Sequence, residues 1–242
     1  MHFIDPDSTL ADIVTARPEL ARELERRSLD YCCGGTRTLD VACRAVDLDP
    51  IQTANELAAV TTAPPEPWTG FGPVELVDHL EATHHAYLHA ELPRLAALAT
   101  KVADVHGANH NELAGVRDTL AGLRAELEPH LAKEERVLFP MIRELAQAAS
   151  APAFHCGSLQ NPISVMLREH DRAGKLLEQL RRLTGSYAVP ADGCASYRAL
   201  YRALEALEAD THLHVHKENN CLFPMVVDLE ARLADPFVEG SR

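Results

Sequence analysis

The sequence contains no long hydrophobic run and no excess of positive charge. None of its apolar stretches reaches the roughly 18 residues that a membrane-spanning helix needs, so we expect no membrane span. Lys and Arg number 23 against 36 Asp and Glu, which gives a formal net charge of -13. A surface of that charge repels nucleic acid and anionic membranes, so we expect neither as a partner.

The sequence also shows no pattern of a secretory signal, so we expect none, and residues 73–233 contain no runs of β-branched residues. Its first residues carry no basic region followed by an apolar core, so we expect a cytoplasmic protein. Six cysteines without a secretory context indicate reduced thiols rather than disulfides. Apolar residues recur at spacings of three and four, which is typical of amphipathic helices and predicts an all-α fold.

Proline and glycine concentrate in one segment, which divides the chain. Residues 61–72, with the sequence TTAPPEPWTGFG, hold three prolines and two glycines and predict a linker. Residues 1–60 before it predict a small domain of short helices, and residues 234–242 predict a frayed tail. Residues 73–233 predict an up-and-down four-helix bundle. Its helices are expected at about 73–98, 109–148, 162–183 and 194–233.

One twelve-residue segment occurs twice. Residues 130–141 (HLAKEERVLFPM) and 214–225 (HVHKENNCLFPM) share the pattern His-x-x-Lys-Glu-x-x-x-Leu-Phe-Pro-Met. A His and a Glu four residues apart lie on one face of a helix, about one turn from each other. Imidazole and carboxylate together bind non-haem iron, zinc or manganese. The repeat extends upstream, because His85 precedes His130 by 45 positions and His170 precedes His214 by 44.

The repeat therefore predicts a helical hairpin that occurs twice, with a metal site at the centre of the bundle. The expected metal ligands are His85, His130, Glu134, His170, His214 and Glu218. Six ligands exceed the four that close a structural zinc site, but they suit two metals bridged by two carboxylates. At least one position then stays open for water, oxygen or another small molecule. Glu126, Glu169 and Asp210 are candidate acceptors for the N–H groups of the ligand imidazoles.

A structural interpretation competes with the metal site. A single His on a helix is more often an ordinary surface or core residue, and an isolated His-x-x-x-Glu pair is usually a surface pair worth a few tenths of a kcal/mol. Duplication at matched spacing favours metal binding. His84 lies only about 100° from His85 on the helix, but the register of Glu169-His170 favours His85. The two Leu-Phe-Pro segments are expected to break the helix and close the dry end of the pocket.

The segment Tyr31-Cys32-Cys33-Gly34-Gly35 is the second unusual feature. Glycines bring backbone N–H groups close to the sulfur atoms, which can stabilise a thiolate. The alternative is that two small residues are buried before a turn, and the residues alone leave both interpretations open. The remaining cysteines are scattered and are expected to be inert: Cys43, Cys156, Cys194 and Cys221.

Taken together, the cysteine segment, the proline-rich linker and the two His-x-x-x-Glu motifs resemble the iron–sulfur cluster repair proteins of the RIC or ScdA family. The similarity covers nearly the whole chain, and the residues around Glu169-His170-Asp171 and Glu218-Asn219-Asn220 fit it too. The resemblance implies a hemerythrin-like bundle holding two iron ions with oxo and carboxylate bridges. It places the six ligands at the positions of the family's iron ligands and Glu126 and Glu169 at those of its further acids.

The resemblance also implies a function, the repair of iron–sulfur clusters damaged by nitric oxide or oxidative stress. The expected partners are damaged iron–sulfur proteins, with nitric oxide or oxygen as small ligand, and Cys32 and Cys33 would transfer iron or a nitrosyl group. The alternatives are a hemerythrin-like sensor of oxygen, nitric oxide or redox state without turnover, and an iron store. Nitric oxide reductase activity and a homodimer are both left open by the sequence.

Overall fold

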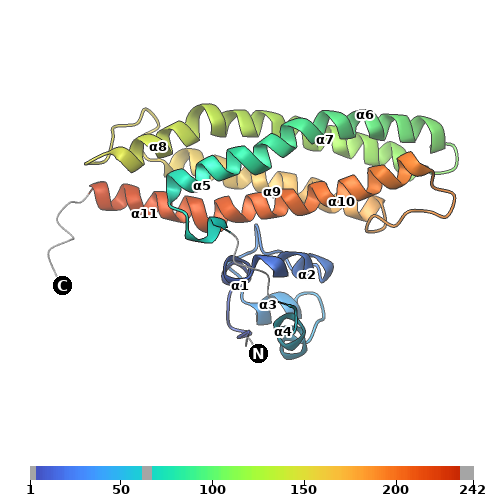
Figure 1. Cartoon of the computed structure of the whole chain (residues 1–242), viewed down its shortest axis with the longest axis horizontal. Helices are drawn as coiled ribbons and strands as arrows, with labels where there is room; N and C mark the ends of the chain where they lie inside the picture. Colours follow the sequence, from blue (N-terminus) through green and yellow to red (C-terminus); the bar gives the residue numbers. More distant parts are fainter. Residues whose placement is uncertain (1–3, 62–66, 235–242) are drawn as a thin grey trace.

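The computed structural model describes residues 4–61 and 67–234, and these residues form an elongated helical bundle with a small helical domain against one side (Figure 1). Over this part of the chain the structure has no β-strand beyond two isolated bridges, which confirms the all-α prediction. The predicted linker residues 62–66 and tail residues 235–242 lie outside the described residues.

The small domain consists of four short α-helices whose starts the sequence explains. The Thr9 hydroxyl accepts a hydrogen bond from Asp12 N, the Thr38 hydroxyl accepts one from Val41 N, and Asp49 accepts one from Gln52 N ahead of Pro50. Three of the helices therefore have side-chain caps. The helices are α1 (Leu10–Ala16), α2 (Ala21–Arg26), α3 (Leu39–Arg44) and α4 (Pro50–Ala58).

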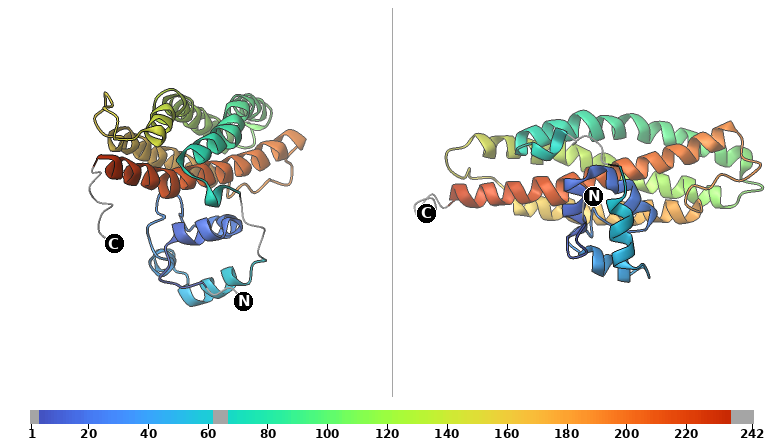
Figure 2. Two further views of the ribbon diagram at one scale, coloured as in Figure 1. Left: turned by 60° about the vertical axis from the view of Figure 1, so that its left-hand side comes forward. Right: turned by 60° about the horizontal axis from the view of Figure 1, so that its bottom comes forward.

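The bundle has four long helical rods, and three of them consist of two α-helices separated by a short segment. Two views show the small domain resting on the side of the bundle formed by the last rod (Figure 2). The rods are α5 (Pro73–Leu80) with α6 (Ala86–His106), α7 (Glu112–Lys133) with α8 (Phe139–Gln147), α9 (Gln160–Leu183), and α10 (Ala195–His216) with α11 (Phe223–Ala234).

Each interruption is a π-helical segment. The segments are η3 (Glu81–His85), η4 (Glu134–Leu138) and η5 (Lys217–Leu222). In η4 and η5 the N–H of the following Phe donates to the carbonyl of the motif Glu, five residues earlier. The next residue in each case is a proline, which has no N–H to continue the α-helical pattern. The prolines were expected to break the helix, and the break takes the π form, which is rare and frequent at functional sites.

Two apolar contacts hold the small domain and the linker on the bundle. Val215 of α10 is buried in the apolar core of the small domain, so that core extends onto the bundle. Trp68 is 2% exposed and packs with Phe139 and Phe223 in the apolar cluster at one end of the bundle. Lys217 Nζ lies 5.0 Å from the Trp68 ring centroid. Trp68 therefore anchors the end of the linker on the bundle.

Candidate metal centre

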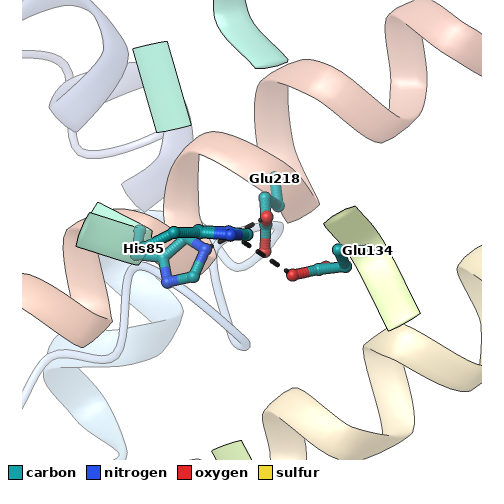
Figure 3. A group of neighbouring side chains, drawn as sticks. His85, Glu134 and Glu218 are labelled. Atoms are coloured by element: carbon teal, nitrogen blue, oxygen red, sulfur yellow. Dashed lines mark hydrogen bonds and ion pairs between the residues drawn. The ribbon is translucent and has the colours of Figure 1, made fainter. Parts of the chain in front are cut away.

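The structure brings all six predicted ligand residues together in the bundle core. Each of the six residues is at most 2% exposed. Figure 3 shows His85, Glu134 and Glu218 pointing toward one another from three different rods. The residues form two overlapping groups, in each of which one possible ligand atom per residue lies within 4.8 Å of the others. The groups are His85, Glu134, His214 and Glu218, and His130, Glu134, His170 and Glu218.

The two glutamates belong to both groups and lie between the histidines. The oxygens of Glu218 separate, with Oε2 3.1 Å from His170 Nε2 and Oε1 3.1 Å from His214 Nε2. Glu134 Oε2 is 3.3 Å from His130 Nε2 and 3.6 Å from His85 Nε2. Each carboxylate thus faces one histidine of each group, which is the arrangement that two bridged cations need.

Several polar atoms of this cluster are buried without a hydrogen-bond partner among the described residues. They include His85 Nε2, both oxygens of Glu134, and Glu218 Oε2. Buried polar atoms are nearly always paired, because an unpaired one costs free energy on folding. Unpaired ring nitrogens and carboxylate oxygens that converge in one buried place fit metal cations.

The protonation of the histidines also suits metal binding. Burial lowers the pKa of His85 to about 4 and that of His130 to about 4. Both rings are therefore neutral near pH 7, and the neutral imidazole is the form that binds a metal. Burial and the neighbouring Glu218 raise the pKa of Glu134 well above its usual range.

Three of the four histidines are oriented through their second ring nitrogen. His130 Nδ1 lies 3.0 Å from Glu169 Oε2, His85 Nδ1 lies 3.0 Å from Glu135 Oε1, and His170 Nδ1 lies 2.7 Å from Asn219 Oδ1. Such partners fix the ring and make it a better ligand. His214 Nδ1 has no acceptor in the described part of the chain.

Of the three acceptors predicted from sequence, only Glu169 is hydrogen-bonded to one of the six ligand residues. Asp210 Oδ1 lies 2.9 Å from Nδ1 of His84, which belongs to neither group. Glu126 also lies outside both groups, because its carboxylate accepts from Arg172 Nε at 2.9 Å on the bundle surface.

Two acceptors were missed, although the repeat contains a signal for them. Glu135 and Asn219 each directly follow the motif glutamate, so they occupy the same position in the two halves. Each reaches across to the upstream histidine of its own half. Comparison of the residue after each motif glutamate would have identified both.

The other histidines near the site make contacts elsewhere. His89 Nε2 lies 2.7 Å from Glu135 Oε1, and His212 Nδ1 lies 3.4 Å from Glu25 Oε1. His216 Nδ1 faces the Tyr31 carbonyl at 3.4 Å, where the small domain meets α10. These rings belong to neither group, so the cluster contains four histidines.

Aromatic rings cover the cluster at matching places in the two halves. The Phe139 ring centroid lies 5.3 Å from that of His85, and the Phe223 centroid lies 6.1 Å from that of His170 in a stacked arrangement. Both Phe side chains are at most 2% exposed. The Leu-Phe-Pro segments therefore wall the site against water, as predicted.

The cysteine pair lies where the small domain meets α9 and α10. Cys32 Sγ and Cys33 Sγ are 3.9 Å apart, and both residues line a cavity of about 700 Å³ together with Asp171, Lys175 and His212. The expected stabilisation of a thiolate is not found at Cys32. The neighbouring Cys33, burial and Asp30 together raise the pKa of the Cys32 thiol well above its usual range.

A Cys32 thiolate lacks this stabilisation because the nearby backbone N–H groups point to Asp30. The N–H groups of Cys32 and Cys33 both donate to Asp30 Oδ1, at 3.1 and 3.0 Å, so they are not available to the sulfurs. The Cys32 thiol also donates to this oxygen, at 3.2 Å. A thiol that serves as a donor to a carboxylate is held in its protonated form.

Comparison with known families agrees with this site. Residues 76–226 match the hemerythrin HHE cation binding domain, and residues 6–61 match ScdA_N, a domain of unknown function. Over 221 residues the chain is 37% identical to the iron-sulfur cluster repair protein YtfE of Cronobacter sakazakii, covering 90% of this chain and 95% of the relative. The chain belongs to the iron–sulfur cluster repair protein family.

Further relatives support the same assignment. The YtfE protein of Escherichia coli O157:H7 is 35% identical over 219 residues, which cover 90% of this chain and 96% of the relative. A probable iron-sulfur cluster repair protein of Haemophilus influenzae is 34% identical over 223 residues, with 90% and 96% covered. The described helices include none long and apolar enough to cross a membrane.

Proposed function

We propose that this protein binds two iron ions at the six-residue cluster and uses them to repair iron–sulfur clusters damaged by nitric oxide or oxidants. The single observation that carries the proposal is the sharing of Glu134 and Glu218 between two groups of buried ligands. The repair function comes from the relatives, which are named for it. The targets are damaged iron–sulfur proteins, and the small ligand is nitric oxide or oxygen.

The donor set supports iron. Imidazole with carboxylate suits non-haem iron, and thiolates, which would favour zinc or an iron–sulfur cluster, are absent from both groups. Two irons bound here would supply redox chemistry and open coordination positions for a diatomic ligand. The residues prepare the site for this: Glu134 and Glu218 offset cation charge, and the Phe139 and Phe223 rings exclude water.

We assign the cysteine pair a transfer role in the same process. Cys33 is partly exposed and borders the cavity, whereas Cys32 is 6% exposed and protonated. Cys33 is thus the thiol that an incoming iron or nitrosyl group meets first. The pair lies next to α9, because Cys33 Sγ is 4.0 Å from the place of a Cβ at Gly174, one helical turn after His170.

Metal analysis and a repair assay test the proposal. Protein purified without oxygen should contain two irons per chain and should restore activity to an iron–sulfur enzyme whose cluster nitric oxide has damaged. His130→Ala should lose both properties, whereas His155→Ala, which changes an exposed histidine outside both groups, should keep them. One zinc per chain would refute the di-iron centre. Reversible binding of nitric oxide without cluster restoration would indicate a sensor instead.

A further inference from the structure

A single side chain joins the cysteine segment to the metal site. Asn219 Oδ1 lies 2.7 Å from His170 Nδ1, and Asn219 Nδ2 donates to the carbonyl oxygen of Cys32 at 3.3 Å. An amide side chain has an acceptor and a donor, so it can serve both partners at once. Asn219 alone therefore links the Cys32 backbone to the His170 ring by hydrogen bonds.

The first half of the repeat has no such connection. Glu135 occupies the matching position, and its carboxylate has only acceptors. It holds His85 and also pairs with His89, which is an exposed side chain of the bundle itself. The two halves thus differ in the residue after the motif glutamate, and the amide lies in the half on which the small domain rests.

Close packing makes the cysteine segment rigid where it meets Asn219. Asn220 Nδ2 donates to the Cys32 carbonyl at 3.1 Å and to the Tyr31 carbonyl at 3.3 Å. A Cβ at Gly35 would lie 2.5 Å from the Tyr31 oxygen and 2.9 Å from Asn220 Oδ1, so the chain has no free space there. A group that binds the thiols therefore lies next to a backbone carbonyl that both asparagines contact.

We propose that Asn219 is a positioning residue that couples the state of the cysteine pair to the metal position formed by His130 and His170. This inference rests on the proposed di-iron site. When a bound group bridges the two thiols, the Cys32 carbonyl moves and the Asn219 amide loses its acceptor. The amide then turns away from His170, whose ring loses its orienting partner. Loss of such a partner weakens metal binding by roughly 10- to 100-fold, so loading of the cysteines favours release of one iron.

Iron release from the di-iron protein tests this coupling. Phenylarsine oxide serves as the probe, because it bridges two neighbouring thiols and releases water. With an iron chelator in excess, the bridged wild-type protein should release one of its two irons at least about 10-fold faster than the free-thiol protein. Replacement of both cysteines by serine should abolish the response.

Two neighbouring asparagines provide the decisive comparison. Asn219→Ala should release one iron quickly whether or not the thiols are bridged. Asn220→Ala removes a bond to the same carbonyl but contacts no residue of the metal cluster, so it should keep the wild-type response. Asn219→Asp keeps the acceptor for His170 and loses the donor to the Cys32 carbonyl. It should therefore hold both irons and release them at the same rate whether the thiols are free or bridged. A wild-type response in Asn219→Asp would overturn the coupling, as would equal acceleration for both irons.

A second readout separates this inference from the metal site itself. In the metal-free protein, NMR of the His170 ring should show a shift when the thiols are bridged, in the wild type and in Asn220→Ala but not in Asn219→Ala. A protein that binds no iron would refute the proposed function while this shift still reports the coupling. An unchanged His170 resonance in the wild type would refute the coupling, whatever the iron content.

Discussion

Glu134 and Glu218 lie together at the centre of the bundle, but only Glu218 is held in its charged form. Its burial alone would raise its pKa, yet His214 and His170, each 3.1 Å away, lower the pKa of Glu218 well below its usual value. Glu134 has the opposite shift, because burial and Glu218 itself raise its pKa. In the metal-free protein the motif glutamate of the first half is therefore protonated, whereas that of the second half is negatively charged.

This difference predicts unequal effects of removing the two charges. In the metal-free protein, Glu134→Gln replaces a protonated carboxyl by an amide of the same shape, so the free energy of unfolding should change little. Glu218→Gln removes the negative charge that faces His170 and the charge-assisted hydrogen bond with His214 Nε2, so it should cost about 1.5–3 kcal/mol. Urea unfolding in the presence of a chelator measures both, and both variants should lose iron. Equal destabilisation by the two substitutions would contradict the assigned charge states.

The buried histidines predict how the stability of the metal-free protein depends on pH. The pKa of His85 and that of His130 are lowered from 6.5 to about 4 by burial. Between these values the unfolded chain binds protons that the folded chain does not, so stability falls as the pH falls from about 6.5 toward about 4. Unfolding at pH 6.5, 5.5 and 4.5 measures the slope. Replacement of both histidines by Asn should reduce it, and a slope that stays the same would contradict the lowered pKa values.

The close approach at Gly35 predicts a large effect from one methyl group. Gly35→Ala places a Cβ 2.5 Å from a backbone oxygen, that of Tyr31, which cannot move away as a flexible side chain could. We expect a loss of about 1–3 kcal/mol in the free energy of unfolding, as for other overpacked sites. Gly70→Ala is the matched control, because no atom lies within 4 Å of its added Cβ. Equal stability of the two variants would show that the turn from Tyr31 to Gly35 has room for the added Cβ.

The sequence predicted the fold and the six clustered residues because both leave periodic signals. Helical spacing of apolar residues predicts the four rods, and the spacing of the repeat selects His85 rather than His84 as the ligand. Which acids reach the ligand rings depends on helix rotation, so Glu126 was expected near the site and instead pairs with Arg172. The contact of Asn220 with Tyr31 joins residues 189 positions apart and leaves no local pattern.

Cys194 was expected to be inert, but its surroundings predict a reactive thiol at the far end of the bundle from the metal centre. It is exposed at the start of α10, where its sulfur accepts from Tyr197 N at 3.5 Å and lies 3.1 Å from His106 Nε2. These contacts, the backbone one first, lower the pKa of the Cys194 thiol to about 7. Its alkylation by iodoacetamide should therefore rise with pH and reach half its maximum near pH 7, followed by mass spectrometry of the peptide. Fully buried Cys43 is the internal comparison and should stay unmodified. His106→Ala should move the midpoint upward, and a wild-type midpoint near the ordinary thiol value of about 8.5 would contradict the assignment.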